Sequence, residues 1–487
     1  MAAELPTTTA GPRTAHRPRD GGGRAGPDGA ARRGATAAAA LGVLALLVLL
    51  TLADGTPNAA RWSLLGLVGG CWAAFAVAAW ALLRTPVRVA VPLLVGGAVV
   101  LQVVAFAFPP RSTDDFYRYV WDGRVQASGT DPYRYVPVDP ALAGLRDPWL
   151  FPPECRNATP PCTRMNHPTD PTIYPPVAQA AFLGVHAVTT GFGWSGPRPL
   201  QGFAALVSIG TTLALVRVLR RSARGDPRRA VLWAWCPTVV LEAGNNAHVD
   251  VLAALLVVVA LGAVAAGRRA RAGTALGAAV ATKLFPLMVL PAVLAPLPRR
   301  GEWRAWVRRT APVLGACAGV VALGYLPHVL AVGGRVVGFL PAYLDEEGYQ
   351  GGGRFALLNL VLPDAIATVA GLALLAVVVL WSVRRADPAR PWVAAVVVVG
   401  AAFALTTVPY PWYGLLLVAL VALDGRAEWL AVAAAAYPVY FTRALDLPLA
   451  ATRQLSYGVA LAIVVVVALA RRRALSTDRA FTTTLTE

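Results

Sequence analysis

Long apolar runs are the feature that most constrains how this sequence can fold. Between residues 37 and 470, runs of roughly 17 to 25 mostly apolar residues recur, separated by short segments rich in Arg, Gly and Pro. Only 14% of all residues are charged, against about a quarter in soluble proteins. The sequence therefore predicts an all-α, polytopic integral membrane protein with about 11–13 transmembrane helices.

The positive charge of the chain gives its orientation in the membrane. A net charge of +18 would suggest nucleic-acid binding in a soluble protein. Here the Arg residues cluster in short loops between apolar runs, as at residues 217–229, 268–271 and 471–473. Such clusters stay on the cytoplasmic side of a membrane. We therefore expect a multi-pass protein of the cell membrane with both termini in the cytoplasm, and no nucleic-acid partner.

This orientation in the membrane divides the chain into three regions. Residues 1–36 are rich in Gly, Pro, Arg and Thr and predict a disordered basic tail on the cytoplasmic side. Residues 37–470 form the membrane domain, in which residues 109–198 make a large extracytoplasmic first loop. Residues 471–487 are a second cytoplasmic tail.

Two apolar segments have no place as simple spans, because crossing the membrane there would carry Arg clusters to the outside. Residues 174–192 are therefore predicted to lie along the outer face as an interfacial helix. Residues 273–297 carry Arg on both flanks and predict a broken, re-entrant helix pair. Its apex is Lys283, the single lysine of the chain.

A compact acidic motif, TDDFYRYVWDGRVQ at residues 113–126, directly follows one predicted span. Asp114 and Asp115 open a predicted helix, on which Asp115, Arg118 and Asp122 share one face. One interpretation is that the acids only complement the helix dipole and pair with Arg118. The other is that a carboxylate, kept ionised by the helix N-terminus, acts as a general base on a hydroxyl group.

Further polar residues are predicted on the same outer side. Asn246, His248 and Asp250 form one turn, and Lys283 and Arg354 supply cations. A structural histidine and a lysine that snorkels to the surface are the alternatives. Cations beside an acid at a lipid-accessible site favour a phosphorylated lipid as substrate. Soluble nucleotide sugars are cytoplasmic, and this face has no Gly-rich nucleotide loop.

The five cysteines indicate little metal chemistry. Cys155 and Cys162 share one polar loop and could form a disulfide in an oxidising space, whereas the other three lie in apolar spans. No spacing requires a metal ion or other cofactor, although the acids of the loop could hold a divalent cation.

This pattern resembles the GT-C superfamily of lipid-linked-sugar glycosyltransferases. Within it, the chain looks like the actinobacterial polyprenol-phosphate-mannose-dependent α-mannosyltransferases. Five motifs, in order along the chain, carry the resemblance: residues 113–124, 129–133, 174–176, 246–250 and 281–286. Residues 137–172 are not matched.

The resemblance implies inverting transfer of mannose from a polyprenyl-phosphate donor to a cell-envelope glycan or glycolipid at the outer face. Asp114 would be the general base and Asp115 would orient the acceptor. Lys283 and an outer arginine would bind the donor phosphate. The full set of substrate-binding residues expected from these motifs and outer cations is Tyr117, Arg118, Asp122, Arg124, Tyr133, Tyr174, Asn246, His248, Asp250, Lys283 and Arg354.

Three other functions fit parts of the pattern. Transfer of arabinofuranose or another sugar from a polyprenyl carrier would need the same groups. A lipid or glycan transporter could use the break at Lys283, but transporters usually show related halves and the polar loop occurs once. An inactive scaffold would tolerate neutralisation of both Asp114 and Asp115.

Overall fold

The computed structural model describes residues 27–54, 62–154, 161–190, 196–294, 296–348 and 353–484. These residues contain helices and connecting segments and no β-strand. Seven helices are long and apolar enough to cross a membrane, or eight if one bent pair counts as a span, and two shorter apolar helices accompany them. The all-α polytopic fold is confirmed, but continuous membrane helices in the described chain are fewer than the 11–13 predicted.

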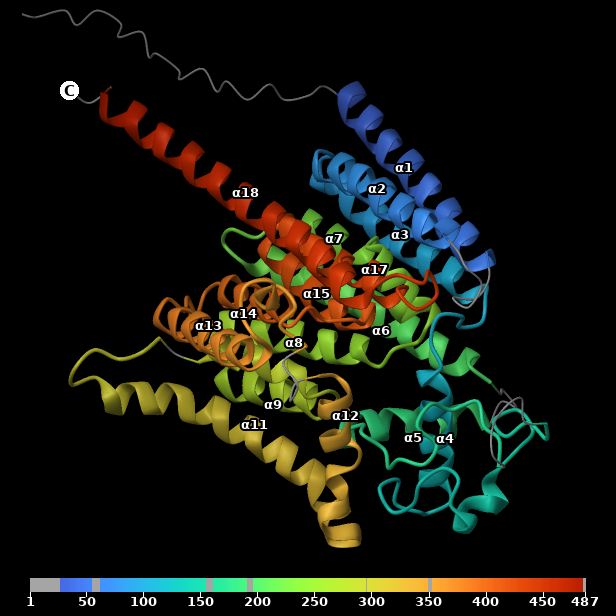
Figure 1. Ribbon diagram of the computed structural model, residues 1–487. Coiled ribbons are helices and arrows are strands. Elements are labelled where there is room, and N and C mark those ends of the chain that lie inside the picture. The colour runs from blue at the N-terminus through green and yellow to red at the C-terminus, as the bar shows by residue number, and fades with distance from the viewer. Residues whose placement is uncertain are drawn as a thin grey trace, which may run out of the picture.

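The first three helices form a layer at one side of the molecule (Figure 1). They are α1 (Pro27–Ala53), α2 (Trp62–Leu83) and α3 (Val87–Phe106), and α1 packs on both others. The tail prediction was wrong for residues 27–36, because they form the first turns of α1, continuous with the apolar run that follows. Residues 1–26 of that tail lie outside the described part of the chain.

The large loop carries two helices of its own, α4 (Asp115–Ala127) and α5 (Pro176–Thr190), with a short 3₁₀ turn η1 (Pro140–Leu145) between them. Both lie together at one end of the molecule (Figure 1). Gly123 permits this close packing, because a Cβ there would come within 2.6 Å of the Phe182 carbonyl oxygen. With 15 residues, α5 is about 22 Å long and too short to span a bilayer, as expected of the interfacial segment.

The apolar run at residues 230–244 does not form one regular helix. After α6 (Arg198–Arg221), the chain forms η2 (Pro227–Ala230), α7 (Val231–Ala234) and a π-helical turn, η3 (Val239–Asn245). Pro237 removes one backbone donor between α7 and η3, which interrupts the helix. The π-helix meets α8 (Asp250–Ala265) at 116°, and the predicted turn at residues 246–249 forms this bend.

The helix break expected at Lys283 is present. α9 (Arg269–Val280) ends before it, and the chain continues as η4 (Phe285–Val289) and α10 (Leu290–Val293). Thus residue 283 lies in irregular backbone. Main-chain groups around the break still find partners: the Val177 N–H donates to the Ala281 carbonyl at 2.8 Å, and the Lys283 N–H donates to the Ala279 carbonyl at 3.0 Å.

The remaining chain supplies the far wall of the molecule. It comprises α11 (Trp303–Val332), η5 (Gly333–Val337), α12 (Leu340–Glu346), η6 (Leu358–Leu360), α13 (Asp364–Arg384) and α14 (Trp392–Leu405). Next come η7 (Pro411–Tyr413), α15 (Gly414–Asp424) and α18 (Leu449–Thr484). Two apolar runs of this region are not single helices. In residues 356–383 the long helix α13 begins only at Asp364, and residues 427–441 are split into η8 (Ala427–Trp429), α16 (Leu430–Ala434) and α17 (Ala436–Tyr440).

Candidate active site

One cavity of about 1000 Å³ lies where the large loop meets the membrane helices. Its walls come from the start of α4, the loop before α5, the break around Lys283, and helices α12, α13 and α14. The sequence separates these segments by up to about 300 residues, so the cavity is a product of the tertiary fold. Its polar end contains Asp114, Asp115, Asn166, Lys283, Arg354 and Arg443.

The two acids stand at the N-terminus of α4, with Asp114 at the N-cap position and Asp115 as the first helical residue. The side-chain amide of Asn166 joins them: Nδ2 donates to Asp114 Oδ1 at 3.0 Å and to Asp115 Oδ1 at 2.9 Å. The Asp115 backbone N–H donates to Thr113 Oγ1 at 3.2 Å. Both carboxylates are therefore held side by side at the cavity wall.

The Asp114 carboxyl is harder to ionise than expected from its helix position. It is open to the cavity on one side, but the surrounding protein and then the charge of Asp115 raise its pKa to about 6. The Asn166 hydrogen bond partly opposes this rise. A carboxylate with a pKa near 6 is ionised at neutral pH and holds a proton more strongly than an ordinary Asp, which suits a general base.

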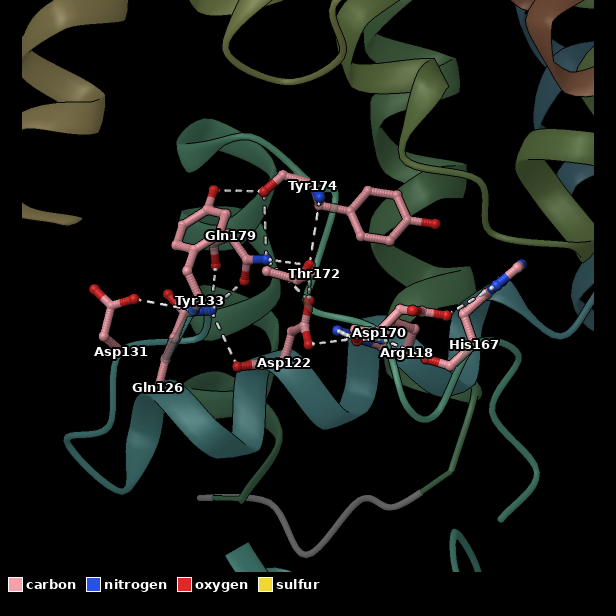
Figure 2. Close-up of polar contacts among 10 residues, drawn as sticks. All are labelled: Arg118, Asp122, Gln126, Asp131, Tyr133, His167, Asp170, Thr172, Tyr174 and Gln179. Atoms are coloured by element: carbon pink, nitrogen blue, oxygen red, sulfur yellow. Dashed lines mark hydrogen bonds and ion pairs between the residues drawn. The ribbon is translucent and has the colours of Figure 1, made fainter. Parts of the chain in front are cut away.

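A buried network fixes the loop over α4 (Figure 2). Asp122 Oδ2 accepts hydrogen bonds from Thr172 Oγ1 at 2.6 Å and Gln179 Nε2 at 2.9 Å, while its Oδ1 accepts from Arg118 Nε at 3.0 Å. The Arg118 guanidinium also donates to the Asp170 carbonyl at 3.2 Å. The network holds together α4, α5 and the segment before α5 that contains Asp170 and Thr172. Asn166 lies in the same segment, so the network helps to fix its position beside the two acids.

Seven predicted binding residues do not line the cavity. Tyr117 packs against Phe116, Asp122 is held by the network, Arg124 pairs with Asp147, and Tyr133 donates to the Tyr174 carbonyl. Asn246 donates to Ser112 and Glu242, His248 stacks on Trp412, and Asp250 pairs with Lys283. Each of these side chains contacts other protein groups, so it positions the walls of the cavity. Arg118 and Tyr174 do reach the lining.

Two of the predicted cations reach the cavity. Lys283 and Arg354 both line the cavity. Lys283 Nζ lies 3.4 Å from Asp250 Oδ2 and above the rings of Tyr174 and Tyr413, at 5.1 and 5.7 Å from their centroids. Arg354 Nη1 lies 2.5 Å from Glu347 Oε2. A third cation that lines the cavity is Arg443, which is exposed.

An aromatic wall went unnoticed in the sequence. Tyr410, Trp412 and Tyr413, from the run TTVPYPWY, line the cavity together with Tyr440. Trp412 stacks on the buried His248 ring with 4.0 Å between centroids. A Pro-aromatic run between two apolar helices was the available signal, because such residues can present flat faces to a sugar or a lipid.

The cavity continues from its polar end into an apolar arm. Its apolar lining includes Leu284, Leu287, Met288 and Pro291 from the break after Lys283, and Leu344, Leu375, Val379 and Val398 from α12, α13 and α14. α10 packs on both α13 and α14. Asn166 and His167, at the polar end, come from the segment 137–172 that matched no motif. The site thus joins acids and cations to an apolar channel.

No group of three or more His, Cys, Asp or Glu side chains suited to a metal ion occurs among the residues that the structure describes. Cys71, Cys236 and Cys317 are free and buried. The disulfide expected between Cys155 and Cys162 involves residue 155, which lies outside the described residues, so it stays a prediction.

The fold and the site define a polytopic membrane protein with an acidic, cation-bearing cavity that opens into an apolar arm. Residues 173–409 match the model of glycosyltransferase family 87. The match supports a glycosyltransferase, a membrane enzyme that uses a sugar donor and an acceptor. It includes Tyr174, His248, Lys283 and Arg354, and it ends before Trp412. No curated protein and no solved structure matches the chain.

Proposed function

We propose that this protein is an inverting mannosyltransferase that uses polyprenyl-phosphate mannose at the outer face of the cell membrane. The observation that carries the proposal is the single cavity with two carboxylates and three cations at one end and an apolar arm at the other. A donor with a charged phosphate and a long hydrocarbon tail has the same two-part character. A soluble nucleotide sugar would leave the apolar arm unused.

The donor phosphate belongs among the cations. Lys283 and Arg443 face the cavity, and Arg354 lines it while paired with Glu347. Arg and Lys side chains bind phosphate through charge-assisted hydrogen bonds. Placed there, the phosphate would lie between the carboxylates and the apolar arm, with the isoprenoid chain running past Leu287 and Val379.

The chemistry is a single displacement. Asp114 accepts the proton of the acceptor hydroxyl, whose oxygen forms a bond to the anomeric carbon while the bond from that carbon to the phosphate oxygen breaks. The polyprenyl phosphate leaves with the electron pair of that bond, and the nearby cations balance its growing negative charge. One displacement inverts the configuration of the anomeric carbon. Asp115 orients the acceptor.

The outer-face orientation rests on the Arg distribution. With Arg clusters kept on the cytoplasmic side, the large loop and its acids lie outside. The acceptor would then be a glycan or glycolipid of the cell envelope. A polyprenyl-phosphate arabinofuranose donor would fit the same cavity, so donors carrying either sugar should be compared in one transfer assay with purified protein in lipid.

The pH dependence of transfer should report the Asp114 carboxyl. Since its pKa is raised to about 6, the ionised base is lost as the pH falls through that value. We expect kcat/KM to be constant above pH 7 and to fall about tenfold per pH unit below pH 6. Asn166→Ala removes a hydrogen bond that lowers this pKa, so its profile should shift to higher pH. A profile flat down to pH 5 would contradict the assignment.

The apolar arm should discriminate between donors by the length of their tails. Val379→Trp places an indole in the arm, whereas Val377→Trp changes a residue of the same helix that is 63% exposed and outside the cavity. We expect Val379→Trp to raise KM about tenfold for a long-chain donor and much less for a two-isoprene donor. The Val377 variant should match wild type. Equal effects of Val379→Trp on both donors would contradict a tail in this arm.

A further inference from the structure

His248 lies behind the cavity wall, between two carboxylates. Its side chain is completely buried, with Nδ1 3.6 Å from Asp115 Oδ2 and Nε2 3.7 Å from Glu242 Oε2. Neither ring nitrogen has a hydrogen-bond partner at these distances. The ring also stacks on Trp412, which fixes its plane. The histidine therefore lies between the Asp115 carboxylate at the cavity and a carboxyl group deeper in the protein, just beyond hydrogen-bond distance of each.

Glu242 ends this chain inside the π-helix η3. Its side chain is buried, and Oε2 accepts a hydrogen bond from Asn246 Nδ2 at 2.8 Å. A further charge acts on the imidazole from Lys283, which pairs with Asp250 at 3.4 Å. Asn246 in turn donates to Ser112 Oγ, two residues before Asp114. The row Asp115–His248–Glu242 thus runs from the start of α4 at the cavity wall into the buried interior.

The number of protons limits how this chain can be arranged. If Glu242 and Asp115 were both ionised, each would need an N–H from the His248 ring. The ring would then be an imidazolium, and three charged groups would share a buried space. With a proton on Glu242, the neutral ring accepts at Nε2 and donates from Nδ1 to Asp115. That arrangement keeps one charge, and it places this charge on the carboxylate that faces the substrate.

We propose that Glu242 and His248 are positioning residues that hold Asp115 ionised and oriented at the cavity wall, with Glu242 as the protonated end of the chain. The role in transfer rests on the proposed function, whereas the proton arrangement does not. His248, named in the sequence motif as a substrate-binding residue, acts here through Asp115.

Isosteric variants test the arrangement by activity. Asn presents its amide nitrogen where Nδ1 lies and Gln where Nε2 lies, so His248→Asn keeps a donor toward Asp115 and His248→Gln does not. We expect kcat to fall about 100-fold in His248→Gln and about tenfold or less in His248→Asn, with the donor KM unchanged. Glu242→Gln mimics the protonated acid and should stay within about threefold of wild type, while Glu242→Leu should resemble His248→Gln. Thermal unfolding of each variant identifies those that fail to fold.

A second measurement is independent of any substrate. In ¹⁵N-histidine-labelled protein in lipid, NMR should show one ring protonated at Nδ1 whose shifts stay constant from pH 5.5 to 8, and His248→Asn should remove this signal. A ring protonated at Nε2 or at both nitrogens would overturn the proposal, as would equal kcat in the Asn and Gln variants. If wild type transfers no sugar while the NMR result holds, the proposed function fails and the proton arrangement stands.

Discussion

Asp114→Asn should reduce sugar transfer by about two to four orders of magnitude, the usual effect of losing a general base. Asn has the shape of Asp and can still receive the Asn166 amide through its carbonyl oxygen, so the loop should stay in place. The change removes only the ability to take the acceptor proton. The assay is transfer of radiolabelled mannose from synthetic polyprenyl-phosphate mannose in membranes that contain wild type or variant.

Asp345→Asn is the matched control for this experiment. Asp345 is an exposed residue on α12 outside the cavity, so its neutralisation should leave transfer unchanged. Undiminished transfer by the Asp114 variant would move the base to Asp115, which Asp115→Asn would then test. Wild type that transfers nothing from this donor would count against the mannose donor, and the arabinofuranose donor would be tried next.

Lys283→Met should be the most destabilising single change at the site. Lys283 Nζ and Asp250 Oδ2 are 3.4 Å apart, and the Asp250 side chain is entirely buried. Removing the lysine leaves a buried carboxylate without its partner, a defect of about 3–5 kcal/mol in other proteins. We expect a clear drop in the thermal unfolding midpoint of the protein in detergent.

The double variant Lys283→Met with Asp250→Asn separates stability from function. Without the buried charge, most of the lost stability should return, whereas transfer should stay low because the phosphate-facing cation is absent. Arg224→Met, an exposed cationic residue in an Arg-rich loop, controls for loss of one positive charge. Recovery of transfer in the double variant would show that Lys283 has only a structural role.

The chemical motifs could be read from the sequence because they depend on local spacing. Asp114 and Asp115 after a span, and Lys283 between Arg-flanked apolar halves, are both visible along the chain. Both now line one cavity. Asn166 could not be predicted, because it sits in a segment without apolar periodicity and acts through hydrogen bonds to residues about 50 positions away. The aromatic wall was missed for another reason: the Pro-aromatic run at Tyr410–Tyr413 was visible, but only the packing of distant segments brings it to the cavity.

The direction in which side chains point was the other property that the sequence could not predict. The i, i+4 spacing correctly brought Arg118 and Asp122 together, at 3.0 Å. It could not tell whether that face of α4 points into the cavity or toward α5. Packing against Gln179 and Thr172 turned Asp122 inward, away from any substrate.

Local patterns along the chain were enough to indicate an all-α membrane protein with an acid pair and a helix break, because hydrophobic length, charge placement and helix-breaking residues act over a few turns of chain. Which polar groups share the cavity, and which support it, depended on how distant segments pack. A cavity is bounded by segments far apart in sequence, so the role of each side chain follows from what the fold places opposite it.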